Sequence, residues 1–265
     1  MILVLLLLLE WFLIFSASPR TAPIRKVAIC GAGPAGLCLA KCLSTPNIFG
    51  EGDEQRNMLP EIIDVYETKP DARQASLGGG LQVTSGTFVL QQLGLGLQLE
   101  KASEKVKRVV ARDTSGISEI FEVDVQKMVS STSIPPCYSI MRSALQELLL
   151  DAITTSKNNS AETTTKVTIN SGKKVKEAVE IKDEGKVTLK FEDGSVIGDY
   201  DMVFGSDGIN TRILSSSSSI QASYSGIRVA YCITPTDIGT KSKFYKCVHC
   251  SKYRRPLLHP INHLT

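Results

Sequence analysis

Histidine and tryptophan are scarce in this sequence of 265 residues. It has three histidines, all within residues 241–265, and one tryptophan, Trp11. No Ser–His–Asp or Cys–His arrangement is recognisable, so the sequence predicts no catalytic nucleophile. The formal net charge is only +3, which predicts no nucleic-acid surface. The seven cysteines are odd in number and loosely spaced, and they do not predict a disulfide framework.

The two ends of the chain differ in composition from its middle. Residues 1–23 start with an apolar run broken by Glu10, followed by small residues before Pro19. This pattern favours a cleaved targeting signal for a secretory or organellar location. A membrane anchor through residues 1–17 is the alternative, and a misassigned start codon is left open.

Residues 241–265 form an atypical basic tail with six Lys or Arg and no acid. The tail contains a cysteine pair, Cys247 and Cys250, and a histidine pair, His259 and His263, and these are residue types that bind zinc. The eight residues between the two pairs are fewer than in zinc fingers. Out-of-frame or intron-derived sequence, or an alternative terminus, is the favoured interpretation, and no metal site is predicted.

A strand–turn–helix–strand unit opens the middle of the chain. Residues 25–30 predict a buried strand, residues 37–43 an apolar helix, and residues 61–67 a second, parallel strand. Between the first strand and the helix stands a Gly-x-Gly-x-x-Gly turn (Gly31, Gly33 and Gly36). Such a turn brings backbone and a helix N-terminus close to a pyrophosphate, which predicts dinucleotide binding.

Glu67 stands at the end of the second predicted strand. A carboxylate there can accept hydrogen bonds from the ribose hydroxyls of an adenosine. It also disfavours a 2′-phosphate, so the predicted nucleotide is FAD or NAD rather than NADP. The polar insertion at residues 45–60 explains why Glu67 lies farther from the glycines than usual.

Later segments predict further elements. Helices are expected at residues 86–93 and 139–153, a hairpin at residues 179–191 and a short buried strand at residues 202–204. Residues 104–138 are interpreted as strands and loops of a second subdomain. Residues 213–240 are interpreted as a Ser-rich loop and the start of another sheet.

Three segments, taken in order, resemble the aromatic-ring-hydroxylase family of flavoprotein monooxygenases. They are the glycines ending at Gly80, the helix start MRSALQELLL with Arg142, and MVFGSDGINTR, which contains Asp207 and Gly208. Ser206 replaces the usual alanine of that last motif. The resemblance implies an α/β fold, with a Rossmann-like FAD-binding domain over residues 24–212 and a partial inserted antiparallel β substrate region.

The resemblance also implies the roles of individual residues. Arg142 would reach the flavin side of the cofactor, while Asp207 and Gly208 would contact FAD near its ribityl–phosphate portion and lie close to the route of NAD(P)H. The expected cofactor-binding residues are Gly31, Gly33, Pro34, Ala35, Gly36, Glu67, Gly80, Arg142, Asp207 and Gly208.

By this resemblance the expected activity is NAD(P)H-dependent insertion of one oxygen atom from O2 into a small aromatic or polyene substrate. FAD carries that chemistry, so no catalytic side chain is expected. The family's second FAD motif, Gly-Asp-Ala-Ala-His, is absent, and the chain is expected to be C-terminally truncated. An inactive nucleotide-binding remnant and another flavoenzyme, such as a prenyl reductase or a halogenase, remain alternatives.

Overall fold

A four-stranded parallel sheet forms the centre of the computed structural model, in the order β12, β1, β2, β8. These strands are Met202–Gly205, Lys26–Cys30, Ile62–Glu67 and Lys166–Ser171. The parallel sheet confirms the expected α/β class. The structure describes residues 23–46, 48, 59–74, 79–113, 118–132, 134–156, 165–208, 211 and 213, and the strands at 227–231 and 247–251.

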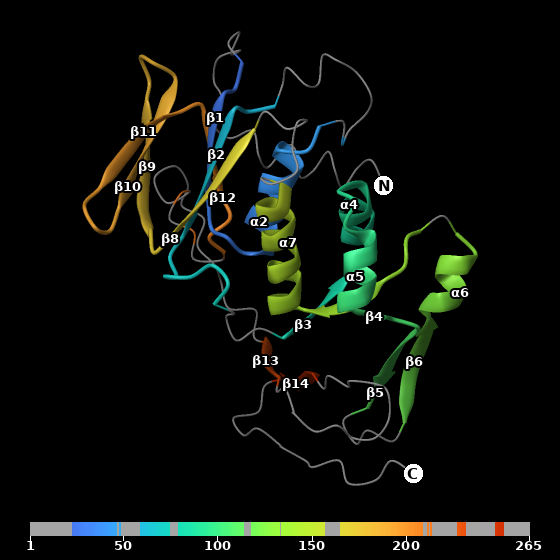
Figure 1. Ribbon diagram of the computed structural model, residues 1–265. Coiled ribbons are helices and arrows are strands. Elements are labelled where there is room, and N and C mark those ends of the chain that lie inside the picture. The colour runs from blue at the N-terminus through green and yellow to red at the C-terminus, as the bar shows by residue number, and fades with distance from the viewer. Residues whose placement is uncertain are drawn as a thin grey trace.

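Helices cover one face of this sheet, and a second sheet covers the other (Figure 1). On the helical side α2 (Pro34–Leu43) packs against α7 (Arg142–Ser156), and α4 (Gly86–Gln92) and α5 (Gly96–Ala102) lie beyond them. The second sheet is antiparallel, in the order β11, β10, β9. Its strands are Val196–Tyr200, Lys186–Phe191 and Val175–Ile181.

Strand β1 explains why both faces of the central sheet are covered. Val27 and Ile29 belong to the core beneath the helices, while Ala28 and Cys30 belong to the core beneath the antiparallel sheet. Successive side chains of a strand point to opposite faces, so this uninterrupted apolar run is buried on both sides. All four residues are at most 2 % exposed.

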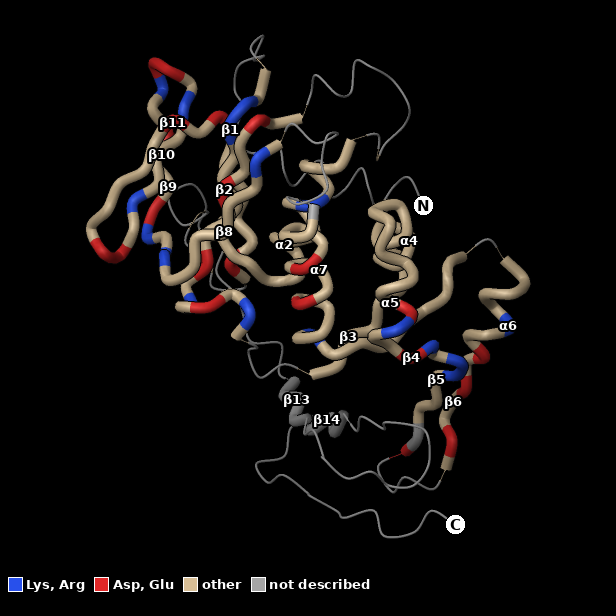
Figure 2. Tube along the Cα trace, viewed as in Figure 1, with Lys and Arg blue, Asp and Glu red and all other residues tan. Residues whose placement is uncertain are grey.

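A buried tyrosine pair links the two sheets. The hydroxyl of Tyr200 donates to Asp64 at 2.9 Å, and the hydroxyls of Tyr66 and Tyr200 lie 2.6 Å apart. Burial, together with the hydrogen bond to Tyr66 and the charge of Asp64, raises the pKa of Tyr200 far above its usual range. Acidic and basic residues both occur on the antiparallel sheet and its turns (Figure 2). Lys173, just before β9, and Asp193, in the β10–β11 turn, form an ion pair at 2.6 Å.

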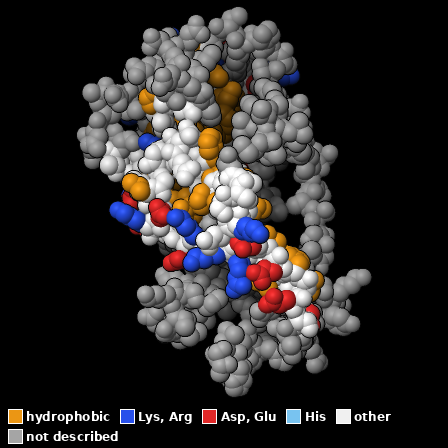
Figure 3. Space-filling view, turned by 90° about the vertical axis from the view of Figure 1, so that its right-hand side faces the viewer, with side chains coloured by type: hydrophobic (Ala, Val, Ile, Leu, Met, Phe, Trp, Pro, Cys, Tyr) orange, Lys and Arg blue, Asp and Glu red, His pale blue; other side chains and the backbone are white. Residues whose placement is uncertain are grey.

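A smaller region extends away from the helices. A three-stranded antiparallel sheet has the order β3, β7, β4, and a separate ribbon pairs β5 with β6. Their bounds are Gly80–Val83, Tyr138–Met141, Glu104–Lys105, Arg108–Arg112 and Glu119–Asp124. Helix α6 (Val125–Ser130) follows, capped by the Asp124 carboxylate, which accepts from the Lys127 N–H. Figure 3 shows charged and hydrophobic side chains side by side on one face of the molecule. In β6, Ile120 and Phe121 are more than half exposed.

Several expected elements are confirmed and others need correction. The helix at residues 86–93 is α4 and the hairpin at residues 179–191 is β9–β10. The predicted helix at residues 139–153 is wrong at its start, because Tyr138–Met141 pairs with β3 and the helix begins only at Arg142. Antiparallel strands are present within residues 104–138, but their assignment to a substrate region stays a prediction.

The predictions for the two ends lie largely outside the described residues. The apolar segment at residues 1–22 is one such case. Within the part that the structure describes, no helix combines the length and the apolarity needed to cross a membrane. In the tail, β14 (Cys247–Ser251) pairs with β13 (Ile227–Tyr231), but the side chains of both strands are outside the description.

The Asp201 carboxylate forms hydrogen bonds that hold the start of β1 in the sheet. Its Oδ2 accepts from the backbone N–H groups of Arg25 at 2.9 Å and Lys26 at 2.8 Å, and its Oδ1 accepts from Lys186 Nζ at 2.6 Å. Burial by itself would raise the pKa of Asp201. The hydrogen bonds from Lys186 and the two backbone groups outweigh it and hold the pKa below its ordinary value.

This shift predicts how stability depends on pH. A carboxyl whose pKa is lower in the folded state stabilises the fold above its unfolded pKa of about 3.9, and this contribution is lost as pH falls through the folded pKa. We expect Asp201→Asn to lower the free energy of unfolding by about 1–3 kcal/mol at pH 7. Urea unfolding between pH 7 and pH 2 should show the difference from wild type shrinking below pH 4. The exposed-turn variant Asp183→Asn is the control, and a pH-independent difference would contradict the account.

Candidate nucleotide-binding site

The turn between β1 and α2 lies at the carboxyl end of the central sheet, where ligands of open α/β sheets bind. Helix α2 starts with Gly33 as its N-cap, in an extended conformation, and with Pro34 in its first turn. Among the residues that the structure describes, no side chain caps this N-terminus, and its first turn holds no acid. The partial positive charge of the helix end is therefore not offset by an acidic side chain of its own first turn.

Gly31 and Gly36 are required by the packing of the protein itself. Gly31 has φ +115°, and a Cβ there would collide with the backbone carbonyl of Ser206. A Cβ on Gly36 would collide with the carbonyl oxygen of Gly31. The turn thus approaches the end of β12 and the first turn of α2 so closely that only glycine fits at these two positions.

Gly33 is different, because the described protein leaves room for a side chain there. Its φ of −72° is open to any residue, and a Cβ would meet only Nη2 of Arg142, at 3.4 Å. Packing of the described residues therefore does not explain the glycine. A ligand lying against the backbone, between the turn and the Arg142 guanidinium, would account for it, and a pyrophosphate would have the matching charge.

Glu67 lies where the sequence predicts it, at the end of β2 beside the turn. Its Oε2 accepts from the N–H of Ala32 at 3.0 Å, and its Oε1 accepts from the N–H of Lys69 at 3.0 Å. Each carboxylate oxygen retains a further lone pair. Glu67 is thus held in place by backbone while it keeps the capacity to accept hydrogen bonds from a ribose.

Arg142 and Gly80 are brought together by the antiparallel pairing of β3 with β7. Gly80 lies opposite Met141, and the N–H of Arg142 donates to the carbonyl of Gly79 at 3.2 Å. The pairing fixes the point at which α7 begins. As a result the Arg142 side chain, which is half-buried, reaches the glycine-rich turn from the helical side.

The Asp207–Gly208 pair follows β12 and lies on the other side of the turn. The N–H of Ser206 donates to the Cys30 carbonyl at 2.8 Å, and a Cβ on Gly31 would lie 2.9 Å from the backbone nitrogen of Asp207. Burial, followed by the negative charge of Asp207, raises the pKa of the Cys30 thiol to about 12. Gly208 adopts φ +90°, which favours glycine.

Two contributors to this site were missed by the sequence analysis. Ser206, noted there only as a replacement of the usual alanine, has its Oγ 3.0 Å from the carbonyl of Cys30 and 2.9 Å from that of Gly31. Gln146 is buried and donates to the carbonyls of Ala32 and Ala72. A polar residue within the apolar pattern of the helix at residues 142–156 was the available signal for Gln146.

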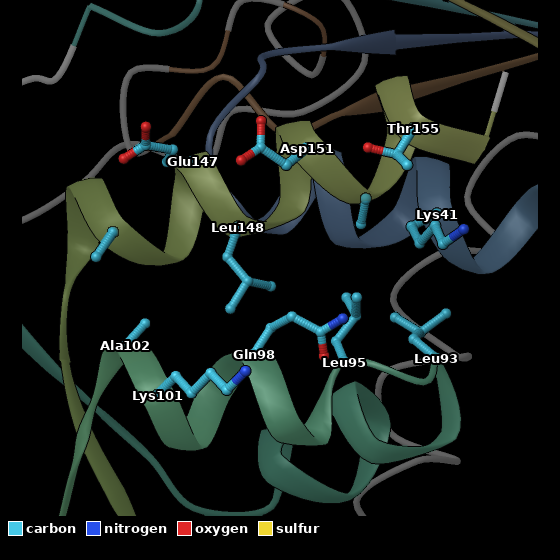
Figure 4. Close-up of a pocket in the computed structure, with 12 residues that line it drawn as sticks. Lys41, Leu93, Leu95, Gln98, Lys101, Ala102, Glu147, Leu148, Asp151 and Thr155 are labelled. Atoms are coloured by element: carbon cyan, nitrogen blue, oxygen red, sulfur yellow. The ribbon is translucent and has the colours of Figure 1, made fainter. Parts of the chain in front are cut away.

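A separate groove of about 680 Å³ lies between α5, α7 and the end of α2 (Figure 4). Leu148 points into it from α7, whereas Glu147 and Asp151 point away from it. None of the predicted cofactor-binding residues lines this groove. Of the predicted residues outside the turn itself, Glu67, Arg142 and Asp207 instead lie at the β1–α2 turn. Gly80 is joined to the site through the pairing of β3 with β7.

Comparisons with known proteins give no family model and no curated protein that matches the chain. Solved structures do match. CtdE in complex with FAD has a TM-score of 0.54 at 17 % identity, over 79 % of this chain and 45 % of that one. 2-Methyl-3-hydroxypyridine-5-carboxylic acid oxygenase has a TM-score of 0.53 at 15 % identity, over 80 % of this chain and 45 % of that one. HpxO of Klebsiella pneumoniae, complexed with FAD, has a TM-score of 0.51 at 23 % identity, over 71 % of this chain and 41 % of that one.

These similarities define the fold. With its parallel sheet and glycine-rich turn, the chain has the mixed α/β, Rossmann-like fold of these proteins, two of which were solved with FAD. It spans less than half the length of each of them.

The contrast between Gly33 and Gly36 yields a prediction. We expect Gly33→Ala to leave the free energy of unfolding within about 0.5 kcal/mol of wild type while weakening the binding of ADP about tenfold or more. Gly36→Ala is expected to destabilise the fold by more than about 2 kcal/mol, because backbone must move. Thermal unfolding and calorimetric titration with ADP measure the two effects. Equal effects of the two substitutions on stability would refute this division of roles.

Proposed function

We propose that this chain binds FAD and belongs to an NAD(P)H-dependent flavin monooxygenase. The observation that carries the proposal is the arrangement around Gly33. The described residues leave space beside the Gly33 backbone, which lies at the uncapped N-terminus of α2 and faces the Arg142 guanidinium. The Glu67 carboxylate lies next to it, bound to the N–H of Ala32. This combination of charges matches an adenosine diphosphate group, with anionic phosphates at the helix end and ribose hydroxyls at the carboxylate.

Different residues of this chain would contact different parts of the cofactor. The turn from Gly31 to Gly36 would hold the pyrophosphate and Glu67 the adenosine ribose. Arg142, whose guanidinium faces Gly33, would approach the pyrophosphate from the flavin side of the cofactor. Asp207 and Gly208 would contact the ribityl–phosphate portion. When bound, FAD would supply the transfer of electrons to O2, and the protein would supply binding, orientation and exclusion of water.

A monooxygenase is favoured over other flavoenzymes by the similar structures. One of them is an oxygenase whose name states its substrate, 2-methyl-3-hydroxypyridine-5-carboxylic acid, a substituted heteroaromatic ring. By analogy we propose a small aromatic or hydrophobic substrate and O2 for this protein. A prenyl reductase or a halogenase would share the FAD site but would not couple NAD(P)H oxidation to single-oxygen insertion.

A further proposal concerns location, and it is supported only by the apolar run at residues 1–17. We propose that this segment directs the protein to a secretory or organellar compartment or anchors it in a membrane. Cell fractionation of the full chain and of a variant lacking residues 1–17 tests this. Identical distribution of both would refute it.

The cofactor proposal is tested by visible absorption of the purified 265-residue chain. We expect a yellow protein, or a colourless one that takes up about one equivalent of FAD on titration. A flavin-loaded protein that oxidises NAD(P)H and consumes O2 faster with an aromatic substrate supports the monooxygenase. A loaded protein without oxygen consumption indicates another flavoenzyme. A protein that binds ADP but not FAD is a nucleotide-binding chain without flavin chemistry.

Glu67 supplies a second, independent test. We expect Glu67→Gln to weaken ADP binding about tenfold, because a charged acceptor facing two ribose hydroxyls is replaced by a neutral one. The same change should weaken 2′-phospho-ADP much less, since it removes the repulsion of the 2′-phosphate. Glu184→Gln, in an exposed turn, is the matched control. An unchanged ratio of the two affinities would place the ribose elsewhere.

A further inference from the structure

A buried amide lies on the inner side of α7. Gln146 is 6 % exposed and its neighbours Leu145, Leu149 and Leu150 belong to the hydrophobic core. Burial of an amide in such surroundings is unfavourable unless its polar atoms find hydrogen-bond partners. We therefore expect the side chain of Gln146 to have specific hydrogen-bond partners within the fold.

Its partners are two backbone carbonyls that are distant in sequence. Gln146 Nε2 donates to the carbonyl of Ala32 at 2.9 Å and to that of Ala72 at 3.0 Å. Both N–H groups of the amide can be used in this way, and two facing carbonyls require the nitrogen rather than the oxygen at this place. One side chain thus ties the glycine-rich turn to the segment that follows Glu67.

The first of these bonds controls the direction of a backbone donor. The carbonyl of Ala32 and the N–H of Gly33 belong to the same planar peptide group. Holding the carbonyl therefore fixes where the Gly33 N–H points. The preceding N–H, that of Ala32, is held by Glu67 Oε2 at 3.0 Å. The turn is thus fixed on both sides of Ala32, immediately before the position that the described protein leaves open.

Helix α7 reaches this turn through two side chains. Arg142 and Gln146 are four residues apart, so they lie on the same face of the helix one turn from each other. Nη2 of Arg142 would lie 3.4 Å from a Cβ on Gly33, and Gln146 holds Ala32. The helix therefore combines a positive charge with an orienting amide at a single loop.

We propose that Gln146 is a positioning residue of the nucleotide site: it orients the Gly33 N–H toward a bound pyrophosphate and keeps the segment after Glu67 against the same turn. The proposal rests on the proposed nucleotide-binding function and extends it to a residue that need not touch the ligand.

The first test uses ADP as the probe and the full chain. Gln146→Met keeps the length and helix propensity of the side chain but removes the donor. We expect it to weaken calorimetric ADP binding about tenfold, as the loss of two buried hydrogen bonds implies. Gln92→Met, at an exposed position of α4, should stay within about twofold of wild type. Should Gln146→Met fail to fold, Gln146→Asn, which keeps the amide but is too short to reach both carbonyls, takes its place.

Hydrogen exchange separates positioning from general destabilisation. We expect faster amide exchange in the variant at residues 30–36, with exchange at residues 186–191 unchanged. Uniformly faster exchange, or ADP affinity equal to wild type, overturns the positioning role. Absence of ADP binding in wild type overturns the proposed function instead, and the exchange comparison then decides by itself whether Gln146 orients the turn.

Discussion

The close approach of backbone to backbone at the end of β1 is the constraint on which the rest of the site depends. Gly31 lies against the carbonyl of Ser206, and Gly36 against that of Gly31, so three segments meet with no space for a side chain. This contact fixes the height of α2 above the sheet and places β12 beside β1. Asp207, Glu67 and the helix N-terminus are consequently arranged around one turn, although they are far apart in sequence.

Two kinds of interaction then turn this packing into a potential binding site. Backbone groups are fixed by side chains, with Glu67 on the N–H and Gln146 on the carbonyl of Ala32. Charge is supplied from two directions, by the end of α2 and by Arg142. Because the donors are oriented before any ligand arrives, binding would cost little reorganisation. Beside Gly33 the described residues leave space next to the backbone, and we expect the ligand to occupy that space.

How far the sequence predicts this arrangement depends on the range of each interaction. The β1–α2–β2 unit and Glu67 were predictable, because a local glycine spacing and an apolar pattern determine them. Position 139 was assigned to a helix, since no Gly or Pro separates residues 139–141 from the helix that follows. Only pairing with β3, more than 50 residues away, makes them a strand. The partners of Gln146 were likewise unpredictable, because they lie 114 and 74 residues away and are backbone carbonyls without any sequence signal.

The central claim is that the turn, the α2 N-terminus and Glu67 together form a site for an adenosine diphosphate group. Calorimetric titration of the full chain with ADP and with AMP tests it most directly, because AMP keeps the ribose but lacks the second phosphate that the helix end and Arg142 would bind. The account predicts that ADP binds and that AMP binds at least about tenfold more weakly. Binding of neither ligand, or equal affinity for both, would contradict it.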